Sequence, residues 1–245
     1  MDYSGIHMTK HLLTVAVLLA FIMGTATAQR QIYSTSSGEF IFSQANVENG
    51  GKAVPSILRF TCFLHTGEYW HLDFSDMLGM YTGIGVRNVG LITKGQNDPV
   101  TGVDKIKRRS YALGIPLAFK FGSFHNNFYL YAGGEYEWLF HYKEKHFIGD
   151  EKIKFTEWFS HRTNTFVPSV FVGLQFPKGL NLRVKYYLSD FMNRNYVDEN
   201  GNMPYAQFST RVYYLSLSFN LKTRKVKEKL THRDTNFAML QSSFH

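Results

Sequence analysis

Apolar residues alternate with small or charged residues along most of the chain, and a repeat of two residues is typical of β-strands. The clearest stretch runs from Tyr111 to Phe121, where every odd position is large and apolar and the even positions are small residues, Pro116 or Lys120. In a soluble β-sandwich, the apolar face would form the core and the other face would meet water. In a transmembrane barrel, the apolar face meets lipid and the small face lines a narrow lumen.

Seven further segments carry this alternation, which brings the predicted number of strands to eight. Four are regular and cover residues 128–142, 166–176, 180–188 and 213–221. Three are less regular: residues 39–47, residues 58–74 with Thr66 and Glu68 interrupting the apolar row, and a segment from Met80 whose phase blurs at residues 88–90. The blurred phase suggests a β-bulge. An even number of strands allows a barrel to close with both chain ends on one side.

The connections between these segments alternate strictly between short and long. The short ones cover residues 75–78, 122–127 and 177–179, and the long ones cover residues 46–55, 93–107, 144–161 and 191–205. Outer-membrane barrels have short periplasmic turns and long outer loops. We therefore predict an eight-stranded antiparallel transmembrane up-and-down β-barrel with a filled polar lumen and both termini in the periplasm.

The N-terminus carries an export signal. Lys10 precedes a twelve-residue, largely apolar run that ends at Met23, and small residues follow at Ala26 and Ala28. A charge, a short apolar segment and an A-x-A site form a secretory signal peptide, and the run is short for a transmembrane span. We expect residues 1–28 to be a signal peptide cleaved after Ala28, residues 29–221 to be the barrel, and residues 222–245 to be a flexible basic periplasmic tail. An uncleaved anchor is the alternative.

Composition narrows the function classes. The chain has 245 residues, a net charge of +8, 16% aromatic residues and one cysteine. Basic and aromatic residues together suit nucleic-acid binding, but export argues against such a partner. A single cysteine excludes a disulfide framework, and the histidines lack metal-ligand spacing, so we predict no metal site and no cofactor.

The alternation assigns each side chain to one face of the wall. The predicted lumen-facing polar network consists of Arg87, Arg108, Lys120, Glu135, Glu137, His141, Arg183 and Lys185. Lys143 shares this predicted face. The predicted lipid-facing residues are Leu113, Ile115, Leu117, Phe119, Leu130, Trp138, Val172, Leu174, Leu182, Tyr186, Leu215, Leu217 and Phe219. Buried charges are costly unless they pair, so the network is interpreted as an ion-pair plug. The alternative is a narrow conduit that favours anions, because bases outnumber acids in this set.

Two constellations could carry chemistry, and neither leads us to predict an enzyme. Glu135 and Glu137 share the lumen face, but a substrate would have to enter a filled barrel. Ser160 and His161 lie near Glu157 at an outer strand end, where a hydrolase would need a nucleophile and a base. Neighbours on a strand point to opposite faces, so that pair requires a bend. Cys62 shares a phase with Phe60 and Leu64 and is expected to face lipid.

Three segments of the sequence are similar to a known family. Residues 73–90, residues 113–117 and residues 131–136 resemble the PorT-like outer-membrane β-barrel family of Gram-negative bacteria, whose architecture is that of OmpX and OmpA. The likeness covers roughly residues 38–221. It implies an outer-membrane location and brings no catalytic motif. It also implies a link to protein secretion as one role among several.

We therefore expect an integral outer-membrane protein with a structural or binding role in surface interaction, envelope integrity or protein secretion. A narrow porin-like channel is the first alternative and an envelope-lipid-modifying enzyme is the second. Expected partners are the barrel insertion machinery, an envelope or secretion protein, and outer-membrane lipids including lipopolysaccharide. Basic loop residues can pair with lipid phosphates, namely Lys94, Lys105, Lys107, Arg108 and Arg109. Loop aromatics could offer a protein-binding surface, namely Trp158, Phe159, Tyr196 and Tyr205.

Overall fold

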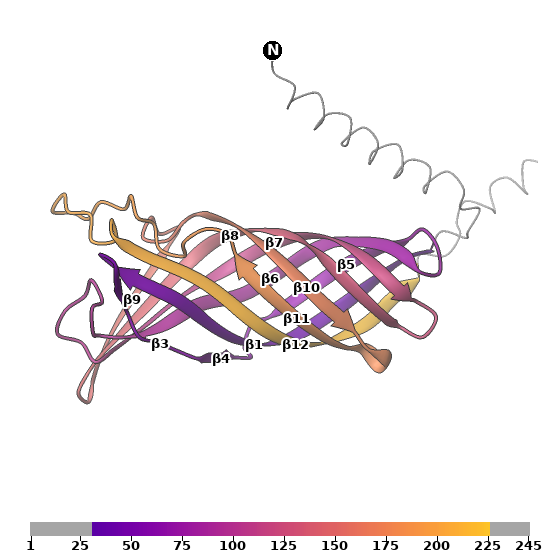
Figure 1. The fold of residues 1–245 in the computed structure, drawn as a ribbon, viewed down its shortest axis with the longest axis horizontal. Coiled ribbons are helices and arrows are strands. Elements are labelled where there is room, and N and C mark those ends of the chain that lie inside the picture. The colour runs from indigo at the N-terminus through magenta and orange to yellow at the C-terminus, as the bar shows by residue number, and fades with distance from the viewer. Residues whose placement is uncertain (1–30, 226–245) are drawn as a thin grey trace, which may run out of the picture.

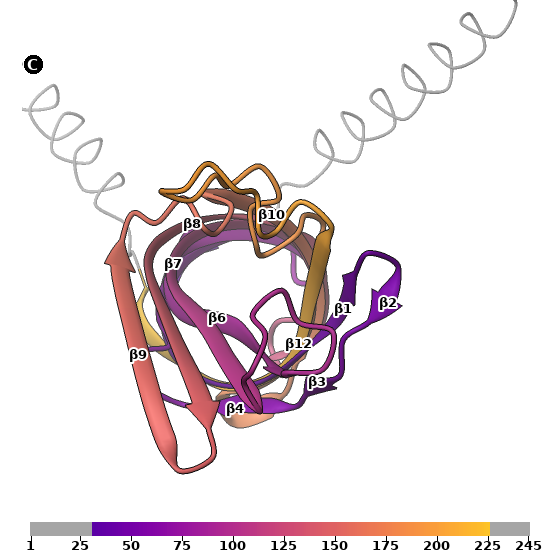
Figure 2. The same cartoon turned by 90° about the vertical axis from the view of Figure 1, so that its left-hand side faces the viewer.

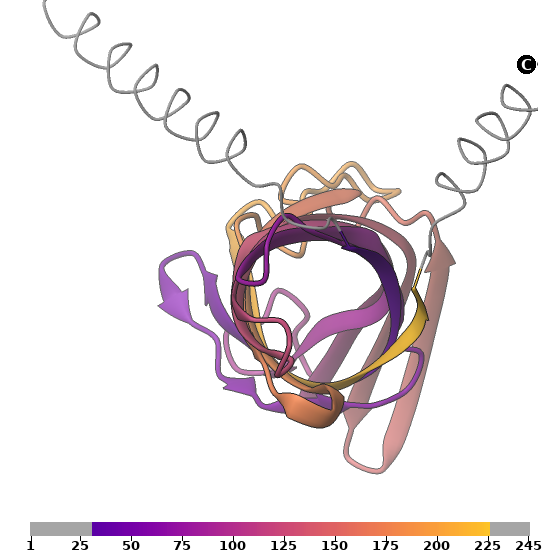
Figure 3. The same ribbon diagram turned by 90° about the vertical axis from the view of Figure 1, so that its right-hand side faces the viewer.

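The alternating segments fold into a closed antiparallel barrel in the computed structural model, which describes residues 31–225 (Figure 1). Its eight strands are β1 (Gln31–Asn49), β5 (Thr66–Asp73), β6 (Leu78–Lys94), β7 (Lys105–Ser123), β8 (Phe128–Ile148), β10 (Phe166–Gln175), β11 (Leu180–Tyr187) and β12 (Phe208–Lys225). Neighbours in this series pair with one another, and β1 pairs with β12 to close the ring. Figures 2 and 3 show the closed ring from its two ends. The predicted eight-stranded barrel is confirmed.

The short turns and both ends of the described chain lie at one end of the barrel. There, Tyr33 near the start of β1 pairs with Lys225 at the end of β12. That strand therefore continues past Leu221, where we expected the barrel to end. The predicted signal peptide and the rest of the predicted tail lie outside the described residues. Within residues 31–225, no helix is long and apolar enough to cross a membrane.

The region predicted as a loop at residues 144–161 is largely a β-hairpin. Strand β8 continues to Ile148, and β9 (Glu151–Trp158) returns along it, paired with β8 alone. The hairpin extends beyond the ring at the end with the long loops (Figure 2). Charged and apolar side chains alternate along β9, from Lys152 and Ile153 to Lys154 and Phe155, and this pattern is typical of a strand.

The predicted second strand, residues 58–74, is divided by a bulge. The short strands β2 (Lys52–Ala53), β3 (Ser56–Ile57) and β4 (Arg59–Thr61) precede β5, and a short 3-10 turn, η1 (Pro177–Gly179), joins β10 to β11. Thr61 pairs with Ile41, but Thr66 pairs with Gly38, so this side has two more residues than β1. Phe63, 78% exposed, projects outward within the extra length. Two extra residues preserve the alternation, which is why the apolar row resumes in phase after the interruption.

Strand β6 lacks the predicted bulge at residues 88–90. It pairs with β7 in one register from Gly85 to Lys94. On its other side, β5 pairs only as far as Val86 and β3 resumes at Ile92. We call this unpaired stretch of the wall the β4–β6 gap. Arg59 spans it by donating to the Asn88 carbonyl at 3.1 Å and to its side-chain oxygen at 2.6 Å. The outward residues of β6 are therefore covered here, which explains the blurred phase.

The outer surface of the wall carries a band of apolar side chains. None of the thirteen predicted lipid-facing residues is buried, and Ile115, Leu117 and Phe119 are each at least 50% exposed. Tyr111 and Phe121 mark the two aromatic ends of this band on β7. Ten residue steps of ~3.3 Å on a strand tilted by about 40° span about 25 Å, which is the height of the apolar band of transmembrane barrels.

Candidate functional site

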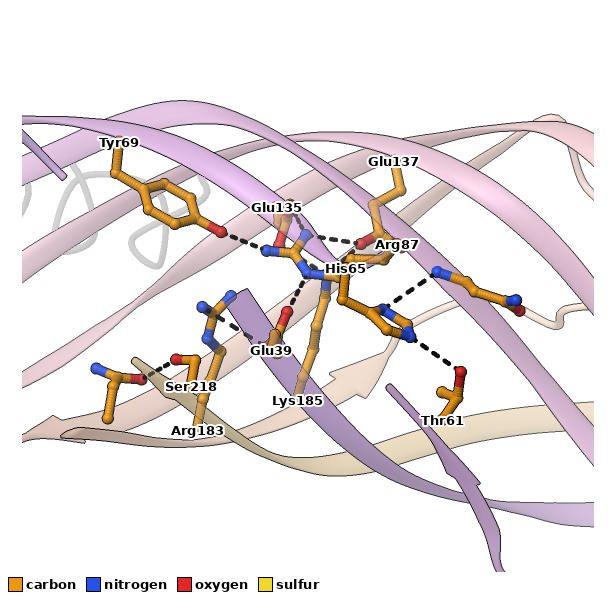
Figure 4. Close-up of polar contacts among 12 residues, drawn as sticks. Glu39, Thr61, His65, Tyr69, Arg87, Glu135, Glu137, Arg183, Lys185 and Ser218 are labelled. Carbon is orange, nitrogen blue, oxygen red and sulfur yellow. Dashed lines mark hydrogen bonds and ion pairs between the residues drawn. The ribbon is translucent and has the colours of Figure 1, made fainter. Parts of the chain in front are cut away.

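A buried ion network fills the middle of the lumen (Figure 4). Arg87 on β6 lies at its centre. It donates to Glu39 Oε2 on β1 at 2.8 Å, to Glu135 Oε1 on β8 at 2.5 Å and to the Tyr69 hydroxyl on β5 at 2.7 Å. These side chains meet because the alternation turns every second residue of each strand inward. Gly114 makes room for them, since a Cβ there would lie 2.2 Å from Glu135 Oε1.

Two cations on β11 complete this network. Lys185 Nζ donates to Glu135 at 2.7 Å and to Glu137 at 2.6 Å, and Arg183 lies 3.8 Å from Glu39. The Tyr187 hydroxyl also donates to Glu137. We call Glu39, Arg87, Glu135, Glu137, Arg183 and Lys185 the central network. It contains three cations and three carboxylates, all buried, so its formal charge is zero.

The lumen is also filled on the side of the short turns. Five aromatic residues form a layer next to the central network, namely Tyr69, Tyr81, Tyr129, Tyr131 and Phe171. A cavity between this layer and Arg183 has a volume of about 10 Å³, which is room for about one water molecule. Beyond it, Lys120 pairs with Asp73 and donates to the Tyr33 hydroxyl at 3.1 Å.

A second ion cluster lies at the end with the long loops. Arg108 donates to both carboxylate oxygens of Asp98, at 2.7 and 2.6 Å, and lies 3.6 Å from Glu144. Because Asp98 belongs to the loop between β6 and β7, this pair ties the loop into the barrel mouth. Burial acts to raise the pKa of Glu144, but His146, Arg108 and Tyr142 together hold it below its ordinary value. Between this cluster and the central network lies an apolar core that includes Val89, Leu139, Phe191, Met192 and Phe208.

Seven of the eight predicted lumen residues point inward, and they fall into three separate groups. Lys120 belongs to the short-turn end, Arg108 to the long-loop end, and the other five to the central network, namely Arg87, Glu135, Glu137, Arg183 and Lys185. The acidic partners Glu39, Asp73 and Asp98 were missed. The sequence alternation could have placed Glu39 in the lumen, because Glu39 shares the inward phase of β1 with Ser37 and Ser43. With these partners included, the expected preference for anions loses its basis.

His141 is the exception, and its predicted placement in the lumen is wrong. Tyr111 pairs with His141 while Ala112 pairs with Leu139, so Phe140 is an extra residue in β8. This bulge reverses the alternation beyond it. His141 therefore faces outward, where its ring stacks on Trp158 with 3.9 Å between centroids. Lys143 moves to the outside for the same reason, with its ammonium 5.7 Å from the Tyr111 ring.

The catalytic candidates have structural partners. Glu135 and Glu137 are held by Arg87 and Lys185. The Ser160 hydroxyl donates a hydrogen bond to Glu157. His161 is exposed, and within residues 31–225 no hydrogen bond joins its ring to Ser160. Across the same residues, no group of three or more His, Cys, Asp or Glu side chains could hold a metal ion.

The predicted loop surfaces are only partly available. Trp158 and Phe159 are each 60% exposed, whereas Tyr205 is buried. Arg108 points inward to Asp98 rather than toward lipid. Cys62 is half-buried beside the bulge, and lines a cavity that opens on the outer surface.

No family model and no curated protein matches the chain, and the similar proteins are solved structures. The chain is similar to Ail, the attachment invasion locus protein of Yersinia pestis, in complex with the heparin analogue sucrose octasulfate (12% identity, 77% of this chain and 99% of that chain covered, TM-score 0.37). It is also similar to Neisserial surface protein A (11% identity, 78% of this chain and 97% of that chain covered, TM-score 0.36). A third similar structure is the outer membrane protein OprG from Pseudomonas aeruginosa (13% identity, 80% of this chain and 98% of that chain covered, TM-score 0.35). At these TM-scores the likeness carries no argument about activity.

Proposed function

We propose that this chain is an integral outer-membrane barrel of a Gram-negative bacterium that does not conduct and that acts through its surface. The central network is the observation that carries this proposal. Its six long side chains fill the lumen and neutralise one another, and an aromatic layer lies directly beside them. Such a network resists opening, because separating a buried ion pair leaves uncompensated charges inside the barrel. It leaves no free charge to attract an ion into the lumen.

The proposed orientation places the short turns and both chain ends in the periplasm. The difference in loop length between the two barrel ends supports this, together with the predicted export signal. Strand β7 extends six residues beyond Tyr111, or ~15 Å along the barrel axis. The barrel wall therefore continues above the apolar band and presents strands, rather than only loops, to the outside.

Within this proposal the role is structural or binding, in surface interaction, envelope integrity or secretion. The resemblance to the PorT-like family supports secretion as one of these roles. The barrel insertion machinery and an envelope or secretion protein are proposed partners. Affinity purification from intact outer membranes tests this part, with enrichment of one envelope protein as the expected result.

Planar-bilayer recording tests the closed lumen. We expect the wild-type protein to insert without discrete conductance steps. A matched variant replaces Arg87, Glu135, Glu137 and Lys185 with serine, which removes two charges of each sign and leaves the Glu39–Arg183 pair. The aromatic layer and the apolar core still fill the lumen of this variant, so it should not conduct either, and a porin recorded in the same bilayer shows that the assay detects an open barrel. Discrete steps from the wild-type protein would contradict the proposal.

A further inference from the structure

Seven cations of β7, β8 and β9 share the outer face of the wall above the apolar band. We call them the outer basic face: Lys105, Lys107 and Arg109 on β7, Lys143 and Lys145 on β8, and Lys152 and Lys154 on β9. Three of them form one cross-strand row, because Lys107 pairs with Lys145 and Lys145 pairs with Lys154. Arg109 pairs with Lys143 in the row below. Like charges directly opposite one another on a sheet are destabilising, and a bound anion would offset this cost.

The described part of the chain supplies no such anion. Among residues 31–225, no carboxylate lies within 4.0 Å of any of these seven cations. The acids of the same hairpin lie on the opposite face, because Glu144, Glu151 and Glu157 alternate with the lysines. Burial and, after it, the neighbouring cations lower the pKa values of Lys107 and Lys145.

The height of this face on the barrel matches that of lipid headgroups. Arg109 and Lys143 come directly above Tyr111 and His141, which stack in the aromatic row at the upper end of the apolar band. Two residues along a tilted strand correspond to about 5 Å along the barrel axis. Aromatic rows mark the membrane–water interface, so the cations begin where the phosphates of a lipid layer lie.

A cavity of about 280 Å³ connects these cations to the apolar band. Its basic lining includes Lys107, Arg109 and Lys145, and its apolar lining includes Phe60 and Phe63. Phe60 is 56% exposed and Phe63 is 78% exposed, and both lie where the chain descends from β4 toward the lipid-facing bulge. The volume is close to the lower end of the range for small-ligand pockets. One cavity thus combines a cationic end at headgroup height with an apolar end toward the acyl chains.

We propose that this cavity and the outer basic face bind a phosphorylated lipid of the leaflet that faces the long loops. The phosphate accepts hydrogen bonds from Lys107, Arg109 and Lys145, and an acyl chain lies against Phe60 and Phe63. The inference rests on the proposed function, because it requires the barrel to stand in a lipid layer. It does not depend on whether the lumen conducts, so the bilayer recording and the binding experiment fail independently.

Native mass spectrometry of the full chain in detergent tests the inference. Lipid A is the probe, and dephosphorylated lipid A is the comparison ligand. We expect lipid A to bind at least tenfold more tightly than the dephosphorylated form. The variant K107Q/R109Q/K145Q should lose about tenfold or more in affinity for lipid A. Its control, K52Q/K178Q/R194Q, removes the same charge from exposed sites elsewhere and should bind as the wild type does. Equal binding by wild type and K107Q/R109Q/K145Q would overturn the proposal.

Two further measurements separate a lipid from a soluble anion and from a folding defect. The variant F60S/F63S should lose affinity for lipid A but not for inorganic polyphosphate; unchanged lipid binding by F60S/F63S would refute the acyl contact and the choice of a lipid. Without lipid, K107Q/R109Q/K145Q should unfold at a higher urea concentration than the wild type, because repulsion across the strands is removed. A lower midpoint would show that the cations are compensated within the protein, which contradicts the argument.

Discussion

Replacing Lys185 with methionine is the most direct test of the central network. The Lys185 ammonium is fully buried and lies 2.7 Å from Glu135 and 2.6 Å from Glu137. Methionine keeps most of the side-chain volume but removes the charge, so two neighbouring carboxylates remain with Arg87 as their nearest cation. Removing one partner of a buried ion pair typically costs 3–5 kcal/mol. We therefore expect Lys185→Met to lower the free energy of unfolding by about 3 kcal/mol or more.

A second substitution makes this expectation specific to charge. Lys185→Met together with Glu137→Gln removes one cation and one carboxylate, which returns the network to neutrality. The glutamine side chain still accepts the hydrogen bond from the Tyr187 hydroxyl. The double variant should be more stable than the sum of the two single effects predicts, by ~0.5–3 kcal/mol, because the two residues are in direct contact.

The assay is urea unfolding of the refolded protein in lipid vesicles, followed by tryptophan fluorescence. Lys52→Met is the matched control, because Lys52 is exposed on β2 and surface substitutions usually change stability by less than ~0.5 kcal/mol. A loss below about 1 kcal/mol for Lys185→Met would refute the reasoning. Strict additivity in the double variant would also refute it, since the two charges would then act independently.

Three other predictions concern the barrel mouth and the lumen. Asp98→Asn should release the loop between β6 and β7 from Arg108, and should raise the rate of its cleavage in limited proteolysis several-fold, while the barrel itself stays resistant. Glu144 has a lowered pKa in the folded protein, so it stabilises the fold above the ordinary value of about 4.3, and this contribution is lost as the pH falls through the lower folded pKa. Glu144→Gln should therefore flatten the acid side of the stability profile in urea titrations between neutral and acidic pH. Gly114→Ala should lower the urea midpoint, at a cost of about 1–3 kcal/mol, because the added methyl group displaces Glu135.

The alternation of residue types was sufficient to predict the barrel and most of the side-chain directions. A repeat of two residues reports which face a side chain occupies as long as the strand is regular, and β7 is regular throughout. The same signal fails at Phe140, because large side chains occupy both faces there and an extra residue leaves no visible trace. His141 and Lys143 were misplaced for that reason alone.

The partners within the lumen required the structure. Arg87 and Glu39 lie 48 residues apart in the chain, and the pairing of β5 with both β1 and β6 brings them together. Periodicity gives the direction of a side chain but not its height in the barrel, so it could not pair charges across the lumen. The outer basic face was partly visible as basic loop residues. Its cross-strand rows depend on the hairpin of β8 and β9, whose residues were predicted to form a loop.

The β4–β6 gap determines where the ring is mechanically weakest. Strands β1 and β12 are paired from Tyr33 to Asn49 with one register shift between Ser34 and Thr35, so the seam between the two chain ends is among the longest in the wall. At the gap, side chains of Arg59 and His65 contact Asn88 in place of a backbone ladder. We therefore expect local opening of the wall to begin beside β4, where a lipid bound in the neighbouring cavity would oppose it.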